Sequence, residues 1–162
     1  MNCTIQEDAN AIALTSYQGG HNEYFKYIYD LLREKNAPQI KIFGGGGGVI
    51  LPEEIKDLMD YGIDRIYSPD DGREMGLQGM IDDLVQKSDF PTGRDIEISV
   101  IDKISYEDPK TIAEVISAVE NFSDEKQDLV NEIDKRILDN QEYSKIPIIG
   151  ITGTGGAGKS SL

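Results

Sequence analysis

The residues with the most specific chemistry lie near the end of the chain. They follow an apolar run, Ile146–Ile151, and have the Gly-x-x-x-x-Gly-Lys-Ser spacing of a phosphate-binding loop. In such a loop, backbone N–H groups and the lysine bind phosphate oxygens, and the hydroxyl after the lysine ligates Mg²⁺. The pattern predicts a nucleotide site with Ser160 as its metal ligand, and its members are Gly153, Thr154, Gly155, Gly156, Ala157, Gly158, Lys159, Ser160 and Ser161.

A run of five glycines, Gly44–Gly48, is the second feature with possible chemistry. The β-branched and aromatic run before it predicts a strand over Gln39–Phe43, and Pro52 with two glutamates after it predicts a helix over 52–61. Backbone without Cβ atoms lets another group come close, and ligands of open α/β sheets bind at the carboxyl ends of the strands. We therefore expect a ligand here, and a flexible linker is the weaker alternative because regular structure brackets the glycines closely.

Two more polar loops follow predicted strands. The apolar run Ala11–Leu14 leads into Thr15–His21, and the short strand Arg65–Tyr67 leads into a turn-rich loop, Ser68–Gly72. Each loop is followed by apolar residues at helical spacing, so a strand, a loop and a helix occur three times. This order predicts a flavodoxin-like (Rossmann-like) α/β fold with a parallel sheet and crossover helices, in which all three loops share one edge.

The sequence predicts three parts. Residues 1–88 form the α/β domain, residues 89–145 a helical linker, and residues 146–162 the first strand and phosphate loop of a P-loop domain. Within the linker, Asp108 and Pro109 predict one helix start and Ser123 predicts the cap of a second helix.

The composition restricts the classes of partner that the chain can bind. The net charge is -14, from 30 acidic and 16 basic residues, which disfavours nucleic acid and anionic membranes as partners. The single cysteine, Cys3, fits a reducing compartment, and no stretch has the length and hydropathy of a membrane span. We expect a cytoplasmic protein.

Three motifs together resemble the cobalamin-binding domain of acyl-CoA mutases such as methylmalonyl-CoA mutase. They are Thr15-Ser-Tyr-Gln-Gly-Gly-His, the glycine run with the following Val-Ile-Leu-Pro-Glu-Glu, and Ile66-Tyr-Ser-Pro. A cobalamin domain, a helical linker and then a phosphate loop is the order that resembles the fused isobutyryl-CoA mutases, in which a GTPase chaperone lies between the cofactor domain and the catalytic barrel.

The resemblance implies a set of cofactor contacts. Thr15 and Ser68 would offer hydroxyls to the nucleotide tail of adenosylcobalamin, and Tyr17 would form an apolar wall. The implied cofactor-binding residues are Thr15, Ser16, Tyr17, Gln18, Gly19, Gly20, Gly44, Gly45, Gly46, Gly47, Gly48, Ser68 and Pro69. The parent protein would be an isomerase that rearranges the carbon skeleton of an acyl-CoA substrate, bind GTP and Mg²⁺ at its P-loop, and form a homodimer. No catalytic residue of the rearrangement is assigned to this chain.

One departure from the family pattern limits the expected binding. The family's cobalt-ligating motif, Asp-x-His-x-x-Gly, does not occur in this sequence, and His21 matches a helix-start position of the family instead. We therefore expect an inactive fragment that binds cobalamin weakly or not at all, with a partial sheet that is marginally stable or self-associates.

Other functions remain open. The chain could be a non-catalytic corrinoid-binding or carrier module, or the loops could be ordinary turns of a flavodoxin-like domain. It could also be a nucleotide-binding regulator of the phosphoacceptor type. Such a regulator needs an acidic cluster at the strand ends, and Asp70 and Asp71 have no matching pair earlier in the chain.

Overall fold

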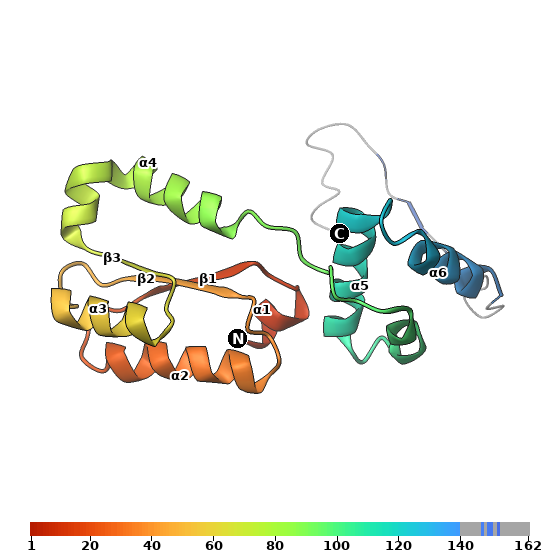
Figure 1. The fold of residues 1–162 in the computed structure, drawn as a ribbon, viewed down its shortest axis with the longest axis horizontal. Coiled ribbons are helices and arrows are strands. Elements are labelled where there is room, and N and C mark those ends of the chain that lie inside the picture. Colours follow the sequence, from red (N-terminus) through yellow and green to blue (C-terminus); the bar gives the residue numbers. More distant parts are fainter. Residues whose placement is uncertain (140–146, 148, 151, 153–162) are drawn as a thin grey trace.

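The core of the chain is a three-stranded parallel sheet. A computed structural model describes residues 1–139 together with 147, 149, 150 and 152. Strands β1 (Ala11–Thr15), β2 (Lys41–Gly45) and β3 (Arg65–Tyr67) lie side by side in the order β1-β2-β3 (Figure 1). The predicted α/β class and parallel sheet are confirmed. Strand β2 begins and ends two residues later than expected, so that Gly44 and Gly45 belong to the strand.

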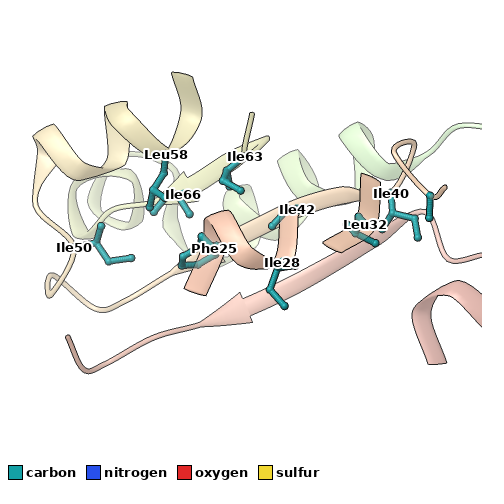
Figure 2. Packing of buried hydrophobic residues seen from close by; sticks show 10 residues of the cluster. Phe25, Ile28, Leu32, Ile40, Ile42, Ile50, Leu58, Ile63 and Ile66 are labelled. Atoms are coloured by element: carbon teal, nitrogen blue, oxygen red, sulfur yellow. The ribbon is translucent and has the colours of Figure 1, made fainter. Parts of the chain in front are cut away.

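Helices cover the two faces of the sheet unequally. Helices α2 (His21–Glu34) and α3 (Pro52–Tyr61) pack on one face, while α4 (Pro69–Ser88) lies over the other (Figure 1). The face under α2 and α3 holds the main core, in which Phe25, Leu32, Ile42, Leu58 and Ile66 are almost completely excluded from solvent (Figure 2). Phe43 is equally buried but lies on the α4 face of the sheet.

Sequence spacing explains why α2 packs as it does. Phe25, Ile28 and Leu32 recur at intervals of three and four residues, so they form one buried stripe along the helix. Tyr24, which also fits a helical spacing, is 47% exposed and lies beside the stripe. The helix begins after Gly20, whose φ of 91° is a left-handed conformation that glycine adopts at little cost.

Helix α4 corrects one prediction. The turn-rich loop expected over Ser68–Gly72 is the first turn of the helix, because Ser68 acts as its N-cap and Pro69 occupies the first helical position. The types of residue that favour a turn are also those that start a helix. Gly76 has φ 66° and ψ 175°, so the helix is kinked there. Every residue from Pro69 to Ser88 keeps part of its surface exposed.

The linker forms a separate helical group beyond the sheet. A short helix, α1 (Asn2–Gln6), precedes β1 and contacts α5 (Pro109–Phe122); neither α1 nor the 3₁₀ helix η1 (Ile98–Lys103) was expected from the sequence. Asp108 caps α5 as predicted, with its carboxylate accepting from the Thr111 N–H. The prediction that Ser123 caps the next helix is wrong, because Ser123 has helical backbone angles at the end of α5 and α6 spans Gln127–Asp139.

The predicted start of the P-loop domain lies almost entirely outside the described residues. The predicted loop at 153–161 is outside the described residues. Of the predicted strand at 146–151, the structure describes only 147, 149 and 150. Over the part of the chain that the structure describes, helices are too short or too polar to cross a bilayer.

Candidate cofactor site

A row of three residues marks the carboxyl end of the sheet. The strand register pairs Thr15 with Gly45, and Gly45 with Tyr67. Side chains alternate between the two faces of a strand, and Ile12 and Leu14 pack toward the α2 core, so Thr15 faces α4. The row therefore lies on the α4 face of the sheet.

An apolar groove lies between this row and α4. It has a volume of about 250 Å³ and almost entirely apolar walls, formed by Ala13, Leu14, Phe43, Gly44, Gly45, Tyr67, Met80, Ile81 and Leu84. On the sheet side, Ala13 and Gly45 contribute little bulk between the rings of Phe43 and Tyr67. Gly45 and Tyr67 of the row belong to this lining, so the groove reaches the carboxyl end of the sheet.

The three loops meet at that edge, as the parallel order of the strands predicts. A Cβ on Gly46 would clash with the carbonyl oxygen of Ser16, in the loop after β1. A Cβ on Gly48 would lie 3.3 Å from Cγ of Pro69, the first residue of α4 after β3. The glycine loop is thus wedged between its two neighbours, and glycine is needed for this close approach.

The two glycines at the tip of that loop have left-handed backbones. Gly47 has φ 57° and Gly48 has φ 92°. Beside them, the ring of Tyr17 lies 3.0 Å from the position that a Cβ on Gly47 would take. Tyr17 is 70% exposed, so its ring lies on the surface beside the glycine loop.

Gly44 is needed for packing of the core. It faces α2, and a Cβ there would clash with the ring of Phe25 and lie 3.0 Å from Cδ1 of Ile66. Of the five consecutive glycines, Gly44 accommodates the core, Gly45 faces the groove, and the remaining three form the loop. Sequence alone placed all five in the pocket, because it could not tell which face each residue takes.

Ser68 lies at the edge but its hydroxyl proton is already used. Its Oγ donates to Oδ2 of Asp71 at 2.8 Å and accepts from the Asp71 N–H at 3.1 Å. The same carboxylate also accepts from the Ser68 N–H at 2.7 Å and is paired with Arg65. One lone pair of the hydroxyl remains available, so a ligand would meet Ser68 as an acceptor.

This network sets the pKa of Asp71. Burial alone would raise it, but the hydrogen bonds from the backbone and hydroxyl of Ser68 and the charge of Arg65 outweigh burial and hold the pKa below its usual value. Because the pKa is lower in the folded state, the ionised carboxylate stabilises the fold at pH values above the ordinary aspartate pKa near 3.9. This contribution is lost as the pH falls through the lower, folded-state pKa.

Replacing Asp71 by asparagine is therefore expected to lower the free energy of unfolding by about 1–3 kcal/mol at pH 7. The difference from the unsubstituted chain should shrink as the pH falls through the lowered, folded-state pKa of Asp71, because the carboxyl group then becomes neutral as well. Urea unfolding at several pH values measures it. Asp70→Asn is the matched control. Asp70 is 76% exposed, so its replacement should lower the free energy of unfolding by less than about 0.5 kcal/mol. Equal losses for the two variants would contradict the assignment.

Tyr67 fixes the second half of α4 above the groove, which the sequence did not reveal. Its hydroxyl donates to Oδ2 of Asp83 at 2.8 Å, and the same oxygen is 2.7 Å from Nζ of Lys87. Burial of the ring and the bond to Asp83 raise the pKa of Tyr67 well above its usual value, so it stays a neutral donor. The signal available in the sequence was a tyrosine on a predicted strand that is followed by an aspartate on the next predicted helix.

His21 supports the loop after β1 instead of facing the groove. It begins α2, is 6% exposed, and its Nδ1 lies 3.4 Å from the Gln18 carbonyl oxygen. Its Nε2 is 3.0 Å from Oε2 of Glu54, within ion-pairing distance but not aligned as a hydrogen bond. This position agrees with the expected role at a helix start. Within residues 1–139, His, Cys, Asp and Glu side chains form no cluster of three that could hold a metal ion.

Comparison with known proteins identifies the chain's relatives. No protein-family model matches the sequence. A fused isobutyryl-CoA mutase of Geobacillus kaustophilus is 48% identical over 164 residues, which is 100% of this chain and 15% of that protein. This chain is related to the fused isobutyryl-CoA mutases. Proteins of the same name from Cupriavidus metallidurans (48% identical over 158 residues) and Nocardia farcinica (42% over 160 residues) each match 98% of the chain and 14% of their own length.

The relationship covers all three predicted parts but a small share of each mutase. The chain spans about 15% of the relatives' length, and the alignment includes the sheet, the linker and nearly all of the remaining residues. The resemblance that the loop motifs suggested is thus confirmed at the level of the family name.

Proposed function

We propose that this chain is the part of an adenosylcobalamin-dependent acyl-CoA mutase that receives the nucleotide tail of the cofactor. The observation that supports it most is the apolar groove beneath α4, whose lining includes Gly45 and Tyr67 at the carboxyl end of the sheet. The named relatives are consistent with this role.

The groove fits the chemistry of that tail. Its end is a flat aromatic base, which requires apolar walls, little bulk beneath it and aromatic surfaces beside it. Ala13 and Gly45 leave the sheet side low, and Phe43 and Tyr67 flank the slot. At the mouth, the Thr15 hydroxyl and the exposed backbone of Gly47 and Gly48 offer donors for the sugar and phosphate.

The residues of this chain bind and orient, and they exclude water from the buried base. Adenosylcobalamin, when bound to the longer mutase, supplies the radical chemistry that begins the 1,2-rearrangement. The cobalt ligand is proposed to come from another segment of that protein, since His21 is held by Gln18 and Glu54. The acyl-CoA substrate and a homodimeric state are likewise proposed for the longer protein.

A valine at position 45 tests the groove directly. A Cβ on Gly45 would already lie 3.3 Å from the Tyr67 carbonyl oxygen, and the larger side chain would project into the slot. Gly45→Val is expected to weaken cobalamin binding at least about tenfold, a loss of about 1.4 kcal/mol. Chemical-shift titration of ¹⁵N-labelled chain measures the affinity, and the unliganded spectrum checks the fold.

Gly19→Ala provides the control. Gly19 belongs to the predicted site, but a Cβ there would meet no heavy atom of the described residues within 4 Å. This variant should bind within about twofold of the unsubstituted chain, or about 0.4 kcal/mol. If a folded Gly45→Val chain also binds normally, the groove is not the site.

A second role, GTP binding with Mg²⁺, is proposed for the loop Gly153–Ser161. The sequence pattern supports it, with Lys159 reaching the β- and γ-phosphates and Ser160 ligating the metal ion. The helix and acidic strand that a complete GTPase needs are not part of this pattern, so hydrolysis is assigned to the longer protein.

A further inference from the structure

A second cavity lies at the opposite edge of the sheet from the groove. Its volume is about 360 Å³. It is bounded by Asp8 before β1, by the turn 36–39 before β2, by the segment 90–96 after α4, and by Glu114 on α5. Because both strands begin beside it, the cavity is at their amino ends, and the cofactor groove is at their carboxyl ends.

Asp8 is the unusual residue of this cavity. Only 7% of its surface is exposed, and Oδ2 has no hydrogen-bond partner among the described residues. Its backbone has φ 46°, a left-handed conformation that is uncommon for residues other than glycine, asparagine and aspartate. A buried carboxylate without a partner is costly, and buried polar groups in native proteins are nearly always satisfied. A cationic partner would remove this cost.

The charges around Asp8 leave the cavity acidic. Glu114 and Asp95 share its lining. Burial raises the pKa of Glu114 and the charge of Asp8 adds to this effect, although Lys110 lies 3.6 Å from its Oε1 and opposes it. Arg94 also lines the cavity, but it pairs with Glu125 at 3.0 Å and lies over the ring of Phe122. Its charge is thus paired with a carboxylate other than Asp8.

The rest of the wall has more apolar than polar surface, although Asn36, Gln39 and Thr92 also line it. Phe90, Pro91, Pro38 and Ile96 contribute ring and hydrocarbon surface. A divalent metal would need more ligands than are present, since no cluster of three acidic, histidine or cysteine side chains occurs within the described residues. An acidic end with apolar walls suits a cation that carries its own hydrocarbon chain.

We propose that this cavity binds a small organic cation, an alkylammonium group on a short apolar chain, with Asp8 as its main counter-ion. The site is separate from the cofactor groove, so neither proposal depends on the other.

Titration of the ¹⁵N-labelled chain with n-butylammonium chloride tests the site. Saturable shifts are expected at the amides of Asp8, Gly93 and Glu114, with a dissociation constant on the order of 1 mM, as befits a ligand of about five heavy atoms. The neutral isostere n-butanol and MgCl₂ at matched ionic strength should leave these signals unchanged. Equal responses to butanol, or a response to Mg²⁺ alone, would overturn the proposal.

Asp8→Asn separates a binding role from a structural one. Asparagine tolerates the left-handed backbone, so the variant removes the charge with little strain. Affinity for butylammonium is expected to fall at least about tenfold, while the melting temperature of the unliganded chain rises by roughly 2–4 °C because an unsatisfied buried charge is gone. The control Glu74→Gln, at an exposed position on α4, should change neither. A lower melting temperature with unchanged affinity would show that Asp8 is structural and refute the proposal.

Discussion

Replacing Gly44 by alanine is expected to lower the free energy of unfolding by about 1–3 kcal/mol, the usual cost of forcing one extra methyl group into a packed core. The added Cβ would run into the ring of Phe25, which is completely buried, and into Cδ1 of Ile66 at 3.0 Å. Phe25 and Ile66 are both almost completely buried, so neither side chain has room to move away from the added methyl group. In a chain of this size, the melting temperature should fall by about 2–4 °C for each kcal/mol.

Gly19→Ala is again the matched control, because it changes a glycine of the neighbouring loop where space is open. Its stability should stay within about 0.5 kcal/mol of the unsubstituted chain, with a small gain from the less flexible unfolded state. Thermal unfolding of the two variants measures the difference in their stability. If Gly44→Ala is as stable as Gly19→Ala, Gly44 is not the contact that lets α2 approach β2.

Replacing Gly93 by alanine should be more damaging and lower the free energy of unfolding by about 2–5 kcal/mol. Gly93 has φ 86°, which costs a residue with a Cβ about 1–2 kcal/mol. In addition, the Cβ would lie 2.6 Å from Cα of Ala118, a fully buried residue of α5. Overpacking against helix backbone adds about 1–3 kcal/mol, because backbone cannot rotate away as a side chain can. We expect the linker helices to lose their docking before the sheet unfolds.

Gly76→Ala separates the two causes of that loss. Gly76 also has a left-handed φ, 66°, but a Cβ there would meet no described heavy atom within 4 Å. With ψ 175°, its backbone lies in a region that only glycine adopts readily, so the substitution should cost only backbone strain, about 1–3 kcal/mol. Hydrogen exchange of the α5 amides distinguishes the variants: faster exchange is expected for Gly93→Ala and unchanged exchange for Gly76→Ala. Equal protection of α5 in both variants would mean that the segment after α4 does not hold α5.

The sequence was most informative where one pattern had one interpretation. Strand β3 and helix α3 have the bounds that were predicted for them, because Pro52 and Gly62 mark the helix ends and a short β-branched run is hard to place otherwise. The three loop motifs together, with the order of the parts, indicated the family, because their residue types and spacing are specific to a relationship and not to a fold.

The failures have physical causes. Ser68 and Pro69 satisfy the rules for a turn and for a helix start equally well, and only packing against the sheet decides between them. The faces taken by Gly44 and Gly45 depend on strand register, which is set by contacts with β1 and β3. The acidic cavity joins Asp8 to Glu114, which lie far apart in the chain, and a sequence gives no sign of such a meeting.

The central claim is that this chain binds the nucleotide tail of cobalamin, and the most direct test compares cobalamin with cobinamide, a corrinoid without that tail. In titrations of the ¹⁵N-labelled chain, cobalamin is expected to bind weakly and shift the amides of Thr15, Gly45 and Tyr67, while cobinamide leaves them unchanged. Visible absorbance should show no histidine ligation, because His21 is occupied. Equal effects of the two corrinoids, or tight histidine-ligated cobalamin, would contradict this account.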